Sequence, residues 1–359
     1  MIRTLAAFMT VLGPLAVGMP ANAQPLYSIT DLGTAPNAPW CAPFAINDLG
    51  AVAGICAGGG AFNETAFVWQ NGVMTSLGTL PRGNYSMAHA INAQGVAVGE
   101  GDTGDFRPDP TLYRNGTVVN IDSNSSNARA IYINDDGLIA GNYAKGFDGV
   151  SAWSAVIWTE RRDKPGRFDR ISLAPYPGGD AKVRYGYAMG ANQGLQVVGY
   201  VQNSLFGQRG AFWDNDPNHT LALLQPPAGH WTSLALGVND LGQAVGQSHP
   251  PFRTRAVLWL NDAGHTPVEL GTLPDDVDST ATAINNEGQI VGASTSASGV
   301  SRPFLWQNGQ MVEVSSLLDA GGADWVIQSI TGINNVGQMV GIGLYQGQPR
   351  TFLLTPAGR

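Results

Sequence analysis

Short apolar segments alternate with turn residues along most of the chain, and one ten-residue pattern recurs. It is clearest at residues 283–292, where two apolar residues precede Asn285, Gly288 follows three residues later, and two further apolar residues lead to Gly292. Asn at the first position and Gly at the fourth position of a tight turn are typical of a type I turn. Because apolar residues flank the turn on both sides, the pattern predicts a short β-hairpin.

The pattern occurs seven times, each time as an Asn followed seven residues later by a Gly. The pairs are Asn47 with Gly54, Asn92 with Gly99, Asn134 with Gly141, Asn192 with Gly199, Asn239 with Gly246, Asn285 with Gly292, and Asn334 with Gly341. Six copies also have a Gly three residues after the Asn, whereas the copy at Asn192 has Gly194 instead. Consecutive Asn residues are 45, 42, 58, 47, 46 and 49 residues apart. Since one four-stranded propeller blade takes roughly 40–50 residues, the spacing predicts an all-β, seven-bladed propeller.

Two further apolar segments follow each hairpin. The first usually ends in Trp, as at residues 66–69 and 256–259, and the second ends in Leu-Gly, as at residues 74–78. In several copies an Asn-Gly pair such as Asn71-Gly72 lies between them, and this pair is favoured in two-residue hairpin turns. Each blade is therefore predicted to contain four strands, which we name A, B, C and D in chain order.

The two ends of the chain carry incomplete blades. Residues 24–33 resemble a strand D, whereas the chain closes at residues 351–355 with a strand C that has no strand D after it. We therefore expect the N-terminal strand to complete the seventh blade, which closes the ring and removes an open sheet edge. Residues 24–359 are predicted to form a single domain.

The repeats resemble a known family. Ala-Phe-x-Trp-x-Asn-Gly-x-Met-x-x-Leu-Gly-Thr-Leu, followed by Ala-x-Ala-Ile-Asn-x-x-Gly-x-x-Val-Gly, is similar to the HAF family of probable extracellular bacterial repeats, and the likeness covers nearly all of the predicted mature chain. The histidine of the family's His-Ala-Phe is not kept, since Thr65 or Gly210 stands there. The resemblance implies export and a propeller-like fold, and it supplies no agreed activity and no catalytic residues.

Residues 1–23 have the features of a signal peptide. Arg3 precedes an apolar stretch at residues 5–17, and the small-x-small sequence at residues 21–23 suits signal peptidase. The apolar stretch is short and is interrupted by Gly13 and Pro14, so we do not expect it to span a membrane. The sequence predicts export to the periplasm or the extracellular space, without membrane insertion.

Cys41 and Cys56 flank the first hairpin symmetrically, six residues before Asn47 and six residues after Gly50. They should therefore lie opposite each other on adjacent strands. Exported proteins meet oxidising conditions, so a disulfide is expected, with free thiols or a metal pair as the alternatives.

Charge and motif content exclude several functions. Charged residues make up 13% of the chain, the net charge is −8, and there are only three lysines, so non-specific binding to nucleic acid or anionic membranes is not expected. The five histidines lack metal-binding spacing. Acidic residues at 102–109 and 275–278 match no calcium motif, although His230 could face the second group. We predict neither a cofactor nor a metal, and the oligomeric state is left open.

The nine tryptophans fall into two groups. Five end a strand C and are expected to pack between blades: Trp69, Trp158, Trp213, Trp259 and Trp306. The others lie on the face that carries the longer B–C and D–A loops, which we call the long-loop face; the opposite face, with the A–B and C–D turns, is the tight-turn face. Aromatic residues lie seven to nine residues before the hairpin Asn in five blades: Trp40, Tyr85, Tyr185, Trp231 and Trp325.

These five residues are predicted to form an aromatic collar at the channel mouth, which binds a ligand by stacking. Packing of the barrel top is the alternative interpretation. The leading functional hypothesis is an exported binding module that recognises a glycan or protein partner through the long-loop face. An extracellular hydrolase or lyase and a structural envelope protein are the alternatives. Because the sequence has no evident acid, base and nucleophile set, an enzyme is the less favoured class. A charged insertion at residues 160–167, on the tight-turn face, is either a solvated loop or a docking element.

Overall fold

The computed structural model describes residues 27–35, 38–58, 64–123, 127–145, 152–178, 185–203 and 207–358. The predicted signal peptide, residues 1–23, lies outside the described residues, and so do residues 24–26. The predicted cleavage after residue 23 therefore stays a prediction.

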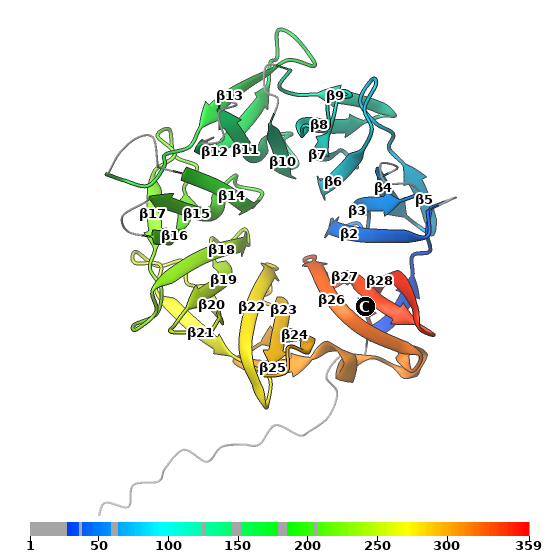
Figure 1. Ribbon diagram of the computed structural model, residues 1–359, viewed down its shortest axis with the longest axis vertical. Helices are drawn as coiled ribbons and strands as arrows, with labels where there is room; N and C mark the ends of the chain where they lie inside the picture. Colours follow the sequence, from blue (N-terminus) through cyan, green and yellow to red (C-terminus); the bar gives the residue numbers. More distant parts are fainter. Residues whose placement is uncertain are drawn as a thin grey trace, which may run out of the picture.

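Seven antiparallel four-stranded sheets are arranged in a ring, with one strand of each sheet nearest the centre (Figure 1). Blade one consists of β2 (Trp40–Ile46), β3 (Val52–Ala57), β4 (Glu64–Gln70) and β5 (Val73–Ser76), and blade two of β6 (Ser86–Ile91), β7 (Ala97–Gly101), β8 (Asp109–Arg114) and β9 (Thr117–Asn120). Blade three consists of β10 (Ala128–Ile133), β11 (Ile139–Lys145), β12 (Ala152–Glu160) and β13 (Phe168–Ser172). Blade four consists of β14 (Tyr185–Ala191), β15 (Val197–Asn203), β16 (Gly207–Trp213) and β17 (Leu221–Leu224).

Blades five and six consist of β18 (Thr232–Val238), β19 (Ala244–His249), β20 (Arg255–Trp259) and β21 (Pro267–Gly271); and β22 (Asp276–Ile284), β23 (Ile290–Ser296), β24 (Ser301–Gln307) and β25 (Gln310–Glu313). Two short 3₁₀ helices, η2 (Val314–Leu317) and η3 (Ala320–Gly322), connect blade six to blade seven. The fold is therefore an all-β, seven-bladed propeller, as the repeat spacing predicts.

The seventh blade combines both ends of the described chain. Its strands are β26 (Trp325–Ile333), β27 (Met339–Tyr345), β28 (Gln348–Pro356) and the N-terminal β1 (Tyr27–Asp31). Strand β1 pairs with β28 from Tyr27 opposite Pro356 to Asp31 opposite Phe352, and Tyr27 is fully buried. The predicted closure of the ring by the N-terminal strand is thus confirmed.

The two glycines of the repeat have different functions. Where a Gly follows the Asn after three residues, it has a positive φ, as at Gly288 (72°). The copy at Asn192 keeps the same turn with Leu195 at φ 55°, so Gly194 does not replace the missing glycine. The later Gly lies against a bulge in strand A, and a Cβ atom at Gly292 would be 2.0 Å from the carbonyl oxygen of Thr280. The close approach of two backbones therefore requires glycine there.

Buried apolar side chains of the described residues form seven clusters, one at each contact between neighbouring blades. The strand C tryptophans contribute to them as predicted. Trp158, Trp213 and Trp259 are fully buried, Trp69 is almost so, and Trp306 is half-buried. The Trp259 indole N–H donates to the carbonyl oxygen of Gln225 at 2.8 Å, so a single side chain packs in the core and satisfies a carbonyl of the preceding blade.

Candidate functional site

A ring of asparagine side chains borders the channel at the tight-turn face. In every repeat the Asn Oδ1 accepts one or two backbone N–H groups of its own turn; Asn285, for example, accepts from Glu287 and Gln289. Its Nδ2 donates to the carbonyl oxygen of Asn334 in the next blade at 2.9 Å. The equivalent bonds run around the whole ring at 2.8–3.1 Å, from Asn334 back to Asn47. We call these seven side chains the asparagine ring.

A second set of bonds involves the residue after each Asn. Its backbone N–H donates to a side-chain oxygen of the next blade, as Gln193 donates to Asp240 at 2.8 Å. Because Ala93 has no side-chain acceptor, one step of this set is missing. Three of these positions carry carboxylates: Asp48, Asp135 and Asp240. No Lys or Arg side chain pairs with them within the described ranges, so this end of the channel is acidic.

Two adjoining cavities lie along the channel. A cavity of about 160 Å³ is lined by the asparagine ring and by the residues next to it. A second cavity, of about 300 Å³, lies against the middle of the inner strands and shares Tyr132 and several apolar residues with the first. Its wall includes the residue three positions before each Asn: Phe44, His89, Ile131, Met189, Leu236, Thr282 and Thr331.

His89 is the one titratable ring of that set. Its ring lies 5.3 Å from that of Phe44, between centroids. Burial, with a further contribution from Arg129, lowers the pKa of His89 to about 4. The imidazole is therefore neutral at physiological pH.

The five predicted collar residues lie at the starts of the inner strands, as expected. Trp40, Tyr185 and Trp325 are the first residues of β2, β14 and β26, and Tyr85 and Trp231 directly precede β6 and β18. None of them lines either channel cavity described above. They therefore lie at the long-loop ends of the inner strands without lining these two cavities, and the collar stays a prediction.

The surroundings of the five rings differ from blade to blade. The Trp325 ring packs on Tyr345 and Phe352 of its own blade, at 5.1 and 5.7 Å between centroids. Burial, followed by the nearby Glu100 carboxylate, raises the pKa of Tyr85. Of the five, Trp231 is the most exposed, at 59%, followed by Trp40 at 37%. Among the described residues no ring contact joins two of the five, so they are separate aromatic groups.

Trp231 belongs to an aromatic corner that the sequence-based prediction missed. Its ring lies 6.5 Å from that of Phe252 at 71° between planes, and Phe252 is 92% exposed. Phe252 occupies a turn closed by the Arg253 N–H donating to the Pro250 carbonyl, and its φ is +60°. A bulky residue at positive φ is uncommon and strained. We call Trp231 and Phe252 the blade-five corner.

Hydrogen bonds fix the backbone of Trp231 in the blade-five corner. The Trp231 N–H donates to the His249 carbonyl at 2.8 Å, and the Trp231 carbonyl accepts from Arg209 Nη1 at 2.6 Å. His249 Nδ1 is 2.7 Å from Thr232 Oγ1. The Trp231 backbone is thus fixed by two blades while its ring stays in solvent.

A second aromatic group lies between blades three and four. Arg129 forms an ion pair with the buried Glu100 at 2.7 Å and stacks over Trp153. Trp153 contacts Tyr187 edge-on at 5.4 Å, and Tyr187 stacks on Tyr200 at 5.6 Å. These residues are half-buried, apart from Glu100. The group joins side chains of blades two, three and four, so its main effect is packing between these blades at the long-loop face.

The acidic loops are explained by internal contacts. Burial opposes ionisation of Asp102, but hydrogen bonds from Asn84, Tyr85 and Phe106 outweigh it and hold its pKa below the usual value. Asp276 pairs with Arg302 at 2.9 Å. His230 lies 3.6 Å from Glu269 and not against residue 275. In the described part of the chain, no three His, Cys, Asp or Glu side chains form a metal-binding group.

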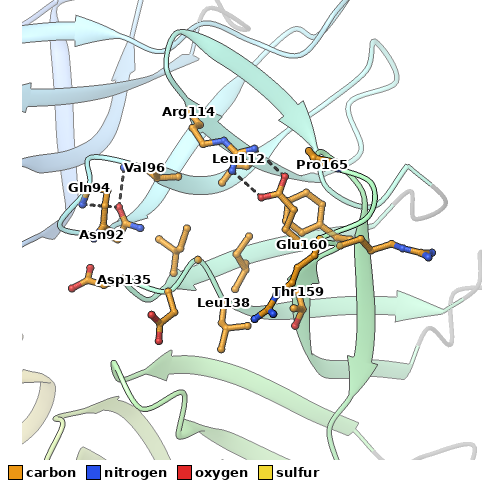
Figure 2. A pocket seen from close by; sticks show the side chains of 17 residues that line it. Asn92, Gln94, Val96, Leu112, Arg114, Asp135, Leu138, Thr159, Glu160 and Pro165 are labelled. Atoms are coloured by element: carbon orange, nitrogen blue, oxygen red, sulfur yellow. Dashed lines mark hydrogen bonds and ion pairs between the residues drawn. The ribbon is translucent and has the colours of Figure 1, made fainter.

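The charged insertion at residues 160–167 covers one side of a groove of about 850 Å³ on the tight-turn face (Figure 2). Glu160 accepts two hydrogen bonds from the Arg114 guanidinium, at 2.8 and 3.0 Å, and one from the Gly166 N–H. Asp135 lines the groove opposite this insertion. The insertion therefore ties blade three to blade two, and its use as a docking element stays a hypothesis.

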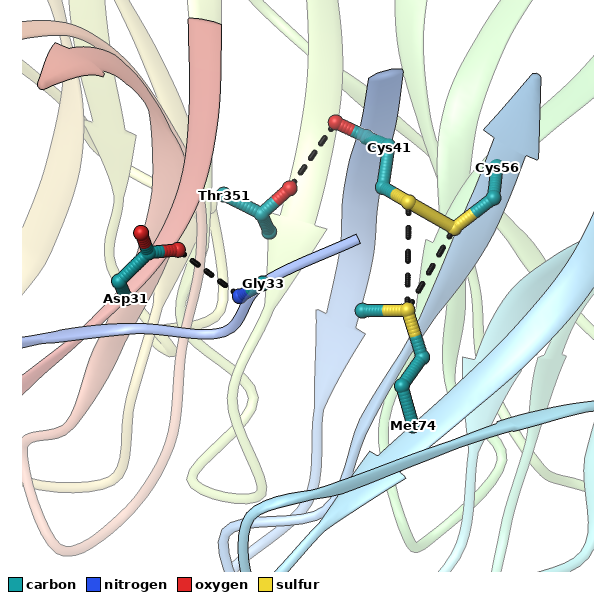
Figure 3. The surroundings of a disulfide bond; sticks show 6 residues. All are labelled: Asp31, Gly33, Cys41, Cys56, Met74 and Thr351. Carbon is teal, nitrogen blue, oxygen red and sulfur yellow. Dashed lines mark hydrogen bonds between the residues drawn. A yellow bond between two sulfur atoms is a disulfide. The ribbon is translucent and has the colours of Figure 1, made fainter. Parts of the chain in front are cut away.

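Cys41 and Cys56 form a disulfide, as predicted from their symmetric spacing, and they are paired across β2 and β3. The Met74 Sδ atom lies 3.9 and 3.6 Å from the two sulfurs (Figure 3). Because disulfide sulfurs carry no hydrogen, these are sulfur–sulfur packing contacts. Thr351 Oγ1 donates to the Cys41 carbonyl at 2.9 Å, so the disulfide lies where blade seven meets blade one.

Within the described ranges, no helix has the length and apolar character that crossing a membrane requires. No protein-family model and no curated protein matches the chain.

Solved structures of similar fold include the β-propeller domain of the Trilobed protease from Pyrococcus furiosus, at 10% identity and a TM-score of 0.53, covering 93% of this chain and 94% of that chain. That domain has an open velcro topology, whereas here β1 closes the last blade. A prolyl endopeptidase structure matches at 8% identity and a TM-score of 0.54, covering 93% of this chain and 51% of that chain. These likenesses establish the class of the protein, a β-propeller, and no activity.

Proposed function

We propose that the protein is an exported binding propeller that recognises a glycan through the blade-five corner on its long-loop face. One observation carries the proposal: Trp231 and Phe252 present two exposed rings at 71° to each other. Sugar rings have apolar faces that stack on aromatic side chains, and amphipathic rings are common anchors of recognition surfaces.

The backbone of Phe252 supports this interpretation. A non-glycine residue in the left-handed region costs on the order of 1–3 kcal/mol, and an almost fully exposed ring gains little packing in the free protein. Such strain is common in binding loops. We interpret Phe252 as a side chain whose contribution arises when a ligand is bound.

Polar groups next to the corner suit hydroxyl-rich ligands. Arg253 follows Phe252 directly and is exposed, and it has no charged or hydrogen-bonded side-chain partner among the described residues. Arg209 and His249 lie against the Trp231 backbone. A sugar ring stacked on Trp231 would therefore meet hydrogen-bond donors at the edge of the sugar. A protein partner would be expected to need a broader apolar patch than this corner offers.

Export and membership of the HAF-like repeats belong to the same proposal. The predicted signal peptide and the sequence resemblance support it, and the disulfide is typical of oxidising compartments. Expression in a bacterial host with the full N-terminus, followed by fractionation and N-terminal sequencing, should give mature protein outside the cytoplasm that begins at Gln24. Retention of residues 1–23 in the cytoplasmic fraction would contradict export.

The binding proposal is tested by a glycan array followed by calorimetric titration of the best binder. Trp231→Ala and Phe252→Gly should each weaken binding by roughly 2 kcal/mol, as truncation of hot-spot residues does. Leu241→Ala is the matched control, because Leu241 is similarly exposed (56%) on the tight-turn face.

Phe252→Gly should bind poorly without losing stability, because it also removes the strained backbone. If no glycan binds, the ligand class is wrong. If a glycan binds and both variants bind it as well as Leu241→Ala does, the assigned surface is wrong.

A further inference from the structure

The middle of the channel differs in character from its tight-turn end. At the tight-turn end, the asparagine ring and its neighbours use their polar groups in hydrogen bonds between blades. The 300 Å³ cavity is bordered mostly by apolar residues, and polar and apolar atoms share its accessible surface about equally. Met189 is 39% exposed although it points into the ring from an inner strand. A ligand that covers accessible apolar surface inside a channel gains binding free energy, because that surface is removed from water.

The cavity wall is also asymmetric. The position three residues before the repeat Asn carries a larger side chain in blades one to five, as at Phe44, Ile131 and Met189. In blades six and seven the same position carries the smaller Thr282 and Thr331. A cavity with one bulky and one small side presents a defined shape, as ligand pockets do.

The hydroxyls of Thr282 and Thr331 donate to strand B carbonyls, and two further polar groups, from neighbouring blades, line the wall. The His89 ring has no hydrogen-bond partner among the described residues, and neither has the Tyr132 hydroxyl. Burial, followed by Asp240, Asp135 and Asp48, raises the pKa of Tyr132. The phenol therefore stays protonated and can donate a hydrogen bond, while the neutral imidazole can donate or accept one.

We propose that this cavity, which we call the channel pocket, binds a small uncharged aromatic molecule with one hydrogen-bonding group. The ring of the ligand would lie against Phe44 and Met189, and its polar group would meet His89 or Tyr132. Ligand pockets span roughly 300–1,000 Å³ and combine apolar walls with a few polar groups. A volume of about 300 Å³ accordingly suits one or two fused rings.

Charge next to the channel pocket disfavours anionic ligands. Asp48, Asp135 and Asp240 surround the adjoining tight-turn cavity without a basic partner in the described part of the chain. A carboxylate in the pocket would be repelled by them, and the neutral His89 would not compensate it. Arg129 lies near His89 but is paired with Glu100.

The test uses indole as the probe, with saturation-transfer NMR and calorimetry on the mature protein. Indole should bind, and the ring signals of His89 should shift on titration. Indole-3-carboxylate should bind at least tenfold more weakly. Absence of indole binding at millimolar concentration would overturn the proposal, as would equal binding of the carboxylate. Tryptamine binding more than tenfold tighter than indole would overturn the uncharged class in favour of cations.

Two variants locate the site. Thr331→Trp should fill the small side of the pocket and abolish indole binding. His89→Leu keeps the wall apolar, removes one polar group and should weaken indole binding several-fold, so it decides the matter if Thr331→Trp does not fold. Leu241→Ala, on the tight-turn face, should bind indole like the wild type. Unchanged affinity in both folded pocket variants would contradict the location. This result is independent of glycan binding at Trp231.

Discussion

The two ends of the channel are formed by the same inner strands, yet they are stabilised differently. At the tight-turn end, every blade uses the same Asn side chain to cap its own turn and to bind the next blade. At the long-loop end, a serine hydroxyl bond recurs in three blades, but other contacts vary: the disulfide in blade one, the Asp102 hydrogen bonds in blade two, and Arg302 with Asp276 in blade six. The repeated end holds the ring together, and the varied end is free to differ between blades.

The difference follows from what each end must accomplish. Because seven blades of similar shape meet at the channel, the same Asn side chain can donate a hydrogen bond to the neighbouring blade at all seven positions. Loops on a rigid scaffold tolerate variation and commonly carry binding residues. The exposed rings of the blade-five corner lie at the varied end, which is where the proposed glycan site is placed.

The largest expected effect comes from removing the strand that closes the ring. A protein that begins at Thr34 lacks β1 and should lose its cooperative unfolding or more than about 5 kcal/mol of stability, because the loss of one fully buried large ring alone costs about 3–5 kcal/mol and Tyr27 is fully buried. Thermal and denaturant unfolding measure this. A protein that begins at Tyr27 is the control. Equal melting temperatures for the two would refute closure by β1 as a source of stability.

The disulfide shows how much stability a contact within a single blade contributes. Replacing both Cys41 and Cys56 by Ala should lower the free energy of unfolding by about 3 kcal/mol, given the 15-residue separation. Reducing agent should destabilise the wild type and leave the double variant unchanged. Two alkylatable thiols in native exported material would contradict the bond.

His89 should make stability depend on pH. Its pKa is about 4 when folded and 6.5 ordinarily, so the unfolded chain binds the proton first and stability falls as the pH drops from 6.5 towards 4. The difference between pH 7.5 and pH 5 should reach about 2 kcal/mol. His89→Leu should lack this component in denaturant titrations at the two pH values. An identical pH dependence in both proteins would show that His89 titrates normally.

Most of the fold could be predicted from local patterns. The Asn and Gly spacing gives the hairpins and the blade number, and the unmatched strands at 24–33 and 351–355 give the closure. The partner of each Asn Nδ2 could not be predicted in this way, because that bond crosses to a residue about one repeat away. Leu195 also escaped prediction, since its positive φ is imposed by the turn and not by its own preference.

The site was predicted less completely. Positions at the starts of the inner strands follow from topology, so the five aromatic residues were placed correctly along the chain. Their contacts depend on neighbouring loops: Trp325 packs on its own blade, whereas Trp231 stays exposed beside Phe252. One signal was available in the sequence. An Arg recurs four residues before the strand C Trp in blades four to six, and in blade four that residue, Arg209, binds the Trp231 carbonyl.

The division between the two ends is tested most directly by measuring unfolding and glycan binding together for Trp231→Ala and Asn239→Ala. Asn239→Ala removes turn and inter-blade bonds at a buried position, so it should lose about 3 kcal/mol of stability while the folded protein binds normally. Trp231→Ala should lose less than about 1 kcal/mol of stability and at least about 2 kcal/mol of binding free energy. If Trp231→Ala unfolds the protein while binding stays intact, the Trp231 ring stabilises the fold and does not bind the ligand. This result would contradict the division between the two ends.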